Sequence, residues 1–163
     1  MIVKATRKLL DRLGEGEIRD GESTTLLGEW YATILPWRPR QLGLLISDRA
    51  LLPVVMPLAP AATLLTRFPE HLADVLTALH VPTGIIENEL AEMRTATVTT
   101  TTNRSRVGSL NEFAHLAQAH RQHHPDQHPD TLDLSLWLAR VPCSPLYQRH
   151  ISPDREMAAL ITR

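Results

Sequence analysis

The chain of 163 residues has little of several features on which common kinds of protein depend. Its single cysteine, Cys143, excludes an intrachain disulfide and a multi-cysteine metal site, and it fits a reducing cytoplasm. No apolar run approaches the ~20 residues that cross a bilayer. The N-terminus, MIVKATRKLL, lacks the apolar core of a signal peptide. We therefore expect a cytoplasmic protein that makes no contact with a membrane.

The chain also lacks an excess of either sign of charge, because its formal net charge is −1. This balance gives no global electrostatic reason to expect binding to nucleic acid or to an anionic membrane. Of the 17 basic residues, two are lysines and 15 are arginines. The bias towards arginine reflects either a GC-rich genome or a preference for bidentate recognition of anions.

The hydrophobic patterns mix strands and helices without regular βα alternation, which favours an α+β fold. We expect one domain over residues 1–163, with a small, mainly antiparallel sheet of about four strands packed with six to eight helices. The strands are expected at residues 2–5, 41–47, 50–56 and 95–102. The helices are expected at residues 7–13, 26–35, 61–67, 85–93, 132–141 and 154–161, with two more beginning at residues 69 and 110.

The helix expected at residues 26–35 and the strand expected at residues 50–56 are the two ambiguous elements, and a proline bears on each. Residues 26–35 carry apolar side chains three to four positions apart, which favours a helix ended by Pro36. Pro53 interrupts the strand at residues 50–56, so that strand is expected at an edge of the sheet or at a bulge.

Residues 95–113, TATVTTTTNRSRVGSLNEF, predict a strand, a polar turn and a helix. Ser109 and Glu112 have the spacing of a capping box at the start of that helix. The N–H groups and dipole of a helix N-terminus, together with two guanidinium groups, favour a phosphate or a carboxylate. The candidate anion-binding residues are Asn103, Arg104, Ser105, Arg106 and Asn111. The alternative is that Arg104 pairs with an acidic residue and Asn103 closes the turn.

Three further groups of residues are candidates for chemistry. In the segment PCSPLYQRHI, Tyr147 and His150, with Arg155 beyond them, are secondary site candidates. Cys143 is either a nucleophile paired with a histidine or a small buried side chain. Residues 118–130, within a histidine-rich stretch that runs from His115 to His128, predict a solvated loop or frayed helix end, although the i,i+4 spacing of His120 and His124 can hold a metal if the helix persists. We expect no metal site and no cofactor.

An aromatic and arginine-rich stretch precedes the second expected strand. It contains Trp30, Tyr31, Trp37, Arg38 and Arg40. Aromatic rings interleaved with arginines can stack on bases and hold phosphates. The same aromatic residues can instead be core anchors beside an interface.

Four segments together resemble one family: ATRKLL, LGEWYATILPWRPRQ, TTNRSRVGSLNEF and CSPLYQRHISPDRE. The chain resembles the DUF6933 family of uncharacterised bacterial proteins, which are similar in turn to the plasmid pRiA4b ORF-3-like proteins. The resemblance covers nearly the whole chain but implies no catalytic residue. The family's segment commonly reads KTTNRSVLGSMNDF, so Thr100 stands in place of the lysine and Arg106 replaces an apolar residue. Arg106 is therefore the candidate substitute for that lysine at an anion.

Two functional hypotheses follow. The first is a non-enzymatic binding or interaction protein of a bacterial gene cluster or mobile element, because no recognised catalytic constellation is present. Its partner is another protein or a second copy of the chain, and nucleic acid is not favoured. The second is an enzyme or binder that acts on a phosphate-bearing ligand, a nucleotide or a nucleic acid, at Asn103–Asn111.

Overall fold

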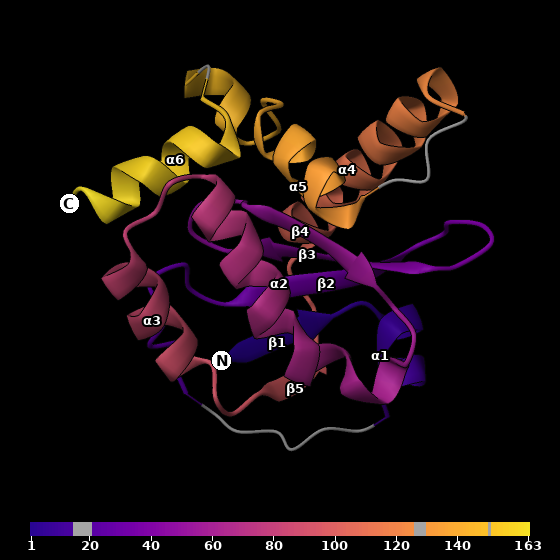
Figure 1. Ribbon diagram of the computed structural model, residues 1–163. Coiled ribbons are helices and arrows are strands. Elements are labelled where there is room, and N and C mark those ends of the chain that lie inside the picture. The colour runs from indigo at the N-terminus through magenta and orange to yellow at the C-terminus, as the bar shows by residue number, and fades with distance from the viewer. Residues whose placement is uncertain (15–20, 126–129, 150) are drawn as a thin grey trace.

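A five-stranded mixed sheet with strand order β4-β3-β2-β1-β5 lies at the centre of the molecule (Figure 1). The computed structural model describes residues 1–14, 21–125, 130–149 and 151–163. The strands are β1 (Ile2–Ala5), β2 (Trp30–Leu35), β3 (Leu42–Ser47), β4 (Pro53–Pro57) and β5 (Thr97–Thr100). β1 runs parallel to β2 and β5, whereas β2 with β3 and β3 with β4 are antiparallel. The α+β class is confirmed, but the prediction of a mainly antiparallel sheet of about four strands is wrong.

Helices cover both faces of this sheet. The described residues form six α-helices: α1 (Arg7–Leu13), α2 (Leu64–Ala78), α3 (Thr83–Glu92), α4 (Arg104–His123), α5 (Thr131–Ala139) and α6 (Pro153–Ile161). The apolar side chains of α1, α2, α3 and α6 join the core on one face, and those of α4 join the core on the other. None of these helices combines the length and the apolar character that a membrane crossing needs.

β2 occupies the middle of the sheet and is buried on both faces, although residues 26–35 were predicted to be helical. Trp30 is 0 % exposed in one core and Tyr31 is 3 % exposed in the other. A strand covered on both faces has apolar residues at successive positions, so the alternation that marks a half-exposed strand is lost. The helical prediction was wrong because the remaining spacing also fits a helix.

Trp30 also anchors the helical layer above it. Its ring meets Phe68 of α2 edge-on, with 4.8 Å between ring centroids. Two helices were predicted here, the second beginning at Pro69, but α2 is continuous and contains Pro69. The proline removes a single helical hydrogen bond, while Phe68, Leu72 and Val75 stay buried along one face of α2. Burial of that face therefore maintains the helix through the proline.

The outer edge of the sheet at β4 is covered by α5. β4 pairs only with β3 within the sheet, which confirms the edge position expected from Pro53. The outward N–H of Val55 donates to Ser135 Oγ of α5 at 2.8 Å, and Ser135 is 0 % exposed. A helical serine thus satisfies a backbone donor that an open edge would expose.

A buried carboxylate fixes the segment that leads into β2. Glu89 of α3 is 3 % exposed and accepts hydrogen bonds from the N–H groups of Leu26 at 2.6 Å and Leu27 at 3.1 Å. Burial raises the pKa of Glu89 above its ordinary value of 4.5, while the two backbone hydrogen bonds and the charge of Arg49 act in the opposite direction. Burial of the ionised Glu89 side chain therefore costs electrostatic free energy, which the two backbone hydrogen bonds offset in part.

The raised pKa of Glu89 predicts a specific pH dependence of stability. The folded state holds this proton more tightly than the unfolded state, so its contribution is complete below pH 4.5 and is lost as the pH rises through the folded-state pKa. The difference in unfolding free energy between the wild type and Glu89→Gln should fall with pH in that window, by at most about 1.4 kcal/mol per pH unit. Denaturant unfolding at several pH values measures it.

Glu87→Gln is the matched control, because Glu87 lies exposed on the same helix. This variant removes an exposed carboxyl from α3 and leaves the Glu89 carboxyl in place, so it controls for the substitution itself. A difference between the wild type and Glu89→Gln that stays constant with pH would contradict the assignment.

Candidate functional site

The predicted polar turn after β5 is largely helix. α4 begins at Arg104, with Asn103 as its N-cap, and the Asn103 side-chain oxygen accepts from the Arg106 N–H at 3.2 Å. Ser109 lies in the second turn of the helix, so the capping-box interpretation was wrong. Asparagine at an N-cap satisfies one of the N–H groups that the helix leaves unpaired. The cap is therefore six residues earlier than Ser109.

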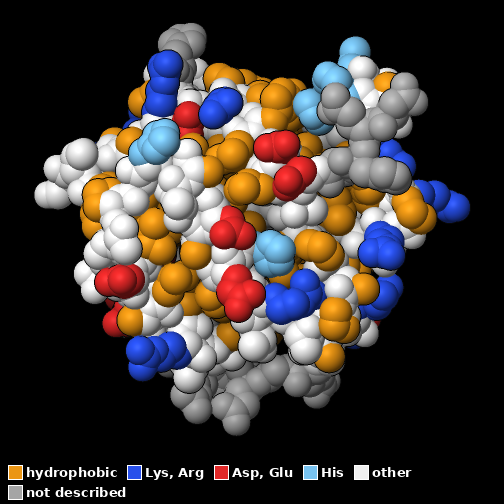
Figure 2. All heavy atoms as spheres, in the orientation of Figure 1, with side chains coloured by type: hydrophobic (Ala, Val, Ile, Leu, Met, Phe, Trp, Pro, Cys, Tyr) orange, Lys and Arg blue, Asp and Glu red, His pale blue; other side chains and the backbone are white. Residues whose placement is uncertain are grey.

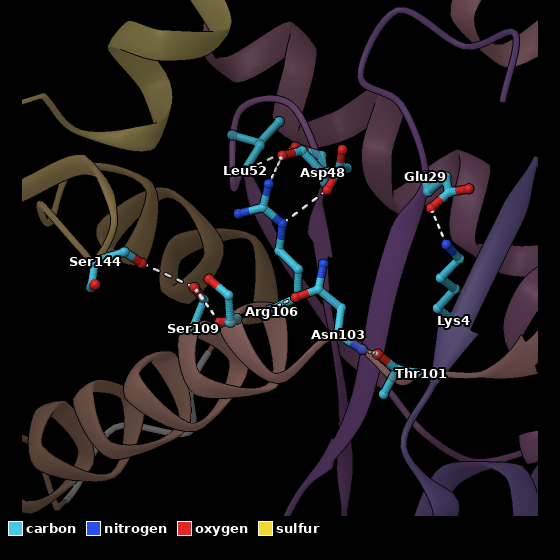
Figure 3. Close-up of polar contacts among 11 residues, drawn as sticks. Lys4, Glu29, Asp48, Leu52, Thr101, Asn103, Arg106, Ser109 and Ser144 are labelled. Carbon is cyan, nitrogen blue, oxygen red and sulfur yellow. Dashed lines mark hydrogen bonds and ion pairs between the residues drawn. The ribbon is translucent and has the colours of Figure 1, made fainter. Parts of the chain in front are cut away.

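Arg106 connects α4 to the turn between β3 and β4 (Figure 3). Its Nε lies 2.9 Å from Asp48 Oδ1, and its NH2 group donates to the Asp48 carbonyl oxygen at 2.8 Å. The Arg106 side chain is 19 % exposed and that of Asp48 is 37 % exposed. Such a two-point, charge-assisted contact is among the stronger polar interactions. Arg106 therefore has a structural role in this conformation, because it joins α4 to the β3–β4 turn.

The other candidate anion-binding residues point elsewhere. Asn103, Arg104, Ser105 and Asn111 are all exposed. Arg104 and Asn111 are seven positions apart, which places them about 20° apart around a helix, whereas Arg106 is about 160° away from Arg104. The structure thus places Arg104 and Asn111 on one face of α4 and Arg106 on another.

Ser109 and Glu112 hold the segment of residues 142–149 that follows α5, which we call the arm. Ser109 Oγ donates to the Ser144 carbonyl oxygen at 2.9 Å (Figure 3). Glu112 accepts from the Ser144 N–H at 3.1 Å and from the Tyr147 hydroxyl at 2.6 Å. The hydrogen bond to Glu112 is the main cause of the raised pKa of Tyr147. Two residues that the sequence assigned to a cap therefore anchor a segment 35 positions away.

The secondary candidates are not brought together by the contacts of the described residues. Tyr147 is 51 % exposed and is bonded to Glu112. Arg155 is exposed in the first turn of α6, where its backbone N–H donates to Asp154 Oδ1 at 2.8 Å. His150 lies outside the described residues, as does His128 of the histidine-rich segment.

Cys143 is a buried thiol. It is 0 % exposed within the core that α4 covers. Burial, together with the nearby charge of Glu112, raises its pKa to about 12, although Arg106 acts in the opposite direction. Thiolates rather than thiols are nucleophiles. Of the two interpretations of Cys143, the small buried side chain is the one with structural support.

The histidine-rich segment continues α4 as far as His123, so it is more ordered than a loop. The His120 ring lies 4.6 Å from that of His124 and 4.4 Å from that of Trp137. The ring Nδ1 atoms of His123 and His124 are hydrogen-bonded to helical carbonyl oxygens. No group of three metal-ligating side chains is found in the part of the chain that the structure describes. Burial and the neighbouring His124 and His123 lower the pKa of His120.

The loop between β2 and β3 collects arginines from three parts of the chain. We call the side chains of Arg12, Arg38, Arg40 and Arg121 the arginine surface. Arg121 of α4 donates to the Arg38 carbonyl oxygen at 2.6 Å, and Arg12 of α1 donates to the Gln41 side chain at 3.1 Å. Figure 2 shows basic side chains along the edge of the molecule where Figure 1 draws this loop and α1. The fold thus gathers cationic groups that are distant in sequence.

The aromatic residues of this stretch are core anchors rather than stacking platforms. Trp30, Tyr31 and Trp37 are 0 %, 3 % and 5 % exposed. The guanidinium of Arg121 lies 4.7 Å from the centre of the Trp37 ring and covers it. Sequence reasoning found Arg38 and Arg40 but missed Arg12, Arg121 and Asp48, because no local pattern indicates which distant residues meet.

The burial of Cys143 predicts an unreactive native thiol. With a pKa of about 12, about one thiol in ten thousand is ionised at pH 8. Native protein mixed with Ellman's reagent should release almost no chromophore over an hour, whereas protein in guanidinium chloride should release one equivalent. The Cys143→Ser variant controls for background colour. Rapid reaction of the native thiol would show that Cys143 is accessible and ionisable.

Comparison with known proteins identifies the family. A family model described as "Domain of unknown function (DUF6933)" matches residues 2–156. No curated protein and no solved structure matches the chain. The matched residues include every strand of the sheet, the whole of α4 and the arm that follows α5. The chain belongs to the DUF6933 family.

Proposed function

We propose that this single-domain protein is a non-enzymatic interaction protein of the bacterial cytoplasm that binds an acidic surface of another protein through the arginine surface. The single observation that carries the proposal is the convergence of Arg12, Arg38, Arg40 and Arg121 from α1, the β2–β3 loop and α4. An accessory role in a gene cluster or mobile element is compatible with such a protein.

Within the part of the chain that the structure describes, the arginine surface takes no part in an ion pair. The ion pairs among the described residues join Lys4 to Glu29, Arg7 to Asp11, Arg106 to Asp48 and Arg149 to Glu156. None of these pairs involves the arginine surface. The formal net charge of the whole chain is −1. The local positive charge at this edge therefore differs from the charge balance of the chain as a whole. Local segregation of charge raises the rate and specificity of association with an oppositely charged partner.

The loop that carries Arg38 and Arg40 is positioned by contacts with α4. Gln118 donates to the Pro36 carbonyl oxygen at 2.7 Å, and Arg121 donates to that of Arg38. Trp37 is buried between these contacts. Two exposed guanidinium groups on an anchored loop lose less conformational freedom on binding than two on a free loop.

A protein partner is favoured over nucleic acid by the burial of the aromatic rings. Recognition of single strands uses exposed aromatic side chains on which bases stack. Trp30, Tyr31 and Trp37 are all at most 5 % exposed. Guanidinium groups without a stacking platform suit carboxylates, which they bind in a bidentate manner.

Charge reversal of the arginine surface tests this function. The double variant Arg38→Glu, Arg40→Glu should lose the partner that the wild type recovers from the source cells, because attraction becomes repulsion. The partner, once identified by mass spectrometry and purified, should bind the wild type more weakly as salt is raised. The affinity of the double variant should be at least tenfold lower, as measured by calorimetry.

The matched control is Arg155→Glu, Arg163→Glu. Both arginines are exposed, α6 lies across the molecule from the β2–β3 loop in Figure 1, and the change in net charge is the same. Equal binding by the wild type and both double variants would refute the proposed surface. Stronger binding to single-stranded nucleic acid than to any acidic protein would move the function to nucleic-acid recognition.

The phosphate-ligand hypothesis remains a second proposal, favoured by the exposed start of α4. The first N–H groups of a helix have no partner within the helix and favour an anion, and Arg104 and Ser105 are exposed there. Arg106 would have to leave Asp48 in order to take part. A rise in melting temperature with nucleotides or phosphosugars, lost in Arg104→Gln, supports this site.

A further inference from the structure

We propose that a pocket between α1, α2, α3 and β5 binds a small monocarboxylate with an apolar tail. The pocket has a volume of about 500 Å³ and is a site separate from the arginine surface. Its walls come from the elements at the lower part of Figure 1: the end of α1, the start of α2, the end of α3 and the strand β5.

Most of the side chains that line the pocket are apolar. Met93 and Val98 are buried, at 2 % and 7 % exposed. Half-buried apolar side chains also line it: Leu13, Leu65, Pro69 and Leu90. A hollow with this lining favours the transfer of an apolar group from water.

Small residues keep the pocket open. Gly14, Ala61, Ala62 and Ala96 line it with at most a methyl group each. A Cβ atom added at Gly14 would meet nothing within 4 Å, and Gly14 has a φ of 81°, which disfavours a larger residue there. A volume of about 500 Å³ lies within the range that small-molecule sites occupy. The pocket is therefore large enough for a ligand of roughly ten to fifteen non-hydrogen atoms.

Among the described residues that line the pocket, two have polar side chains. Arg94 and Thr66 line the pocket and are both exposed. Arg94 supplies a permanent positive charge, and its planar guanidinium matches a carboxylate in two parallel hydrogen bonds. A lining of mostly apolar side chains with one exposed cation fits a ligand that has an apolar tail and an anionic head.

Pro69 adds one more polar feature to the lining. Because proline has no N–H, the carbonyl oxygen of Leu65 lacks the donor that it would have in a regular helix. Leu65 and Pro69 both line the pocket. Arg94 is the cationic side chain of the described lining, so it is the group that selects an ionised head.

Calorimetric titration with decanoate tests the site. Decanoate should bind in a 1:1 ratio, and affinity should increase roughly three- to fourfold for each methylene from hexanoate to decanoate, because each added group leaves water. Decylammonium, with the same tail and the opposite charge, should bind at least tenfold more weakly. Arg94→Gln should weaken decanoate binding about tenfold, as expected for a charge-assisted hydrogen bond, and should abolish the preference over decylammonium.

Two filling variants approach the pocket from opposite sides. Ala62→Phe, before α2, and Ala96→Phe, before β5, each place a ring in the hollow and should remove decanoate binding. Both alanines are exposed, so the variants should fold, as circular dichroism can verify. Ala119→Phe, on the exposed side of α4, is the control for the substitution, and Arg140→Gln is the control for the lost charge.

The outcomes separate this site from the proposed interaction surface. Arg38→Glu, Arg40→Glu should bind decanoate as the wild type does, whatever its effect on a protein partner. Failure of hexanoate, octanoate and decanoate to bind the wild type would overturn the inference. Equal decanoate affinity in the wild type and in both filling variants would overturn it as well.

Discussion

The burial of β2 on both faces is the constraint on which the rest of the fold depends. Trp30 packs into one core and Tyr31 into the other, so neither face of the sheet can open to solvent without exposing a large aromatic side chain. Helices must therefore cover both faces, α2 through Phe68 and α4 through Phe113. Apolar burial of this kind is the dominant favourable term in folding, but it does not specify where each helix begins.

A small number of polar contacts between distant segments supplies that positional information. Glu89 fixes the approach to β2, Ser135 seals the edge at β4, and Arg106 fastens α4 to the turn at Asp48. Glu112 then holds the arm through Ser144 and a tyrosine. Buried or half-buried polar groups need partners, so each contact restricts the arrangement of two elements. The same contacts explain why several residues with suggestive chemistry are already engaged.

The two sites proposed for function, the arginine surface and the pocket, lie outside the polar contacts of Glu89, Ser135, Arg106 and Glu112. The arginine surface is formed on a loop anchored to α4, and its charge differs in sign from that of the chain as a whole. The pocket arises where small residues at Gly14, Ala61 and Ala96 leave a hollow beside the edge strand β5. We propose the arginine surface for an acidic surface of another protein and the pocket for a small amphipathic anion, and the two can be tested independently.

The sequence by itself determined the features that depend on neighbouring residues. The strand and helix at Ile2–Leu13, the β3–β4 pair with Pro53 at an edge, and the helices α5 and α6 follow from local hydrophobic spacing and from proline and glycine positions. The family also follows from local segments such as NRSRVGSLNEF.

Tertiary structure alone decided what depends on distant partners. It made residues 30–35 a central strand, since burial on both faces hides the strand period, and it kept α2 continuous through Pro69. It also bound Arg106 to Asp48 and joined Arg12 and Arg121 to the loop of Arg38. These pairings span tens of residues, and local sequence patterns carry no information about which distant side chains meet, because contact is set by the packing of whole elements.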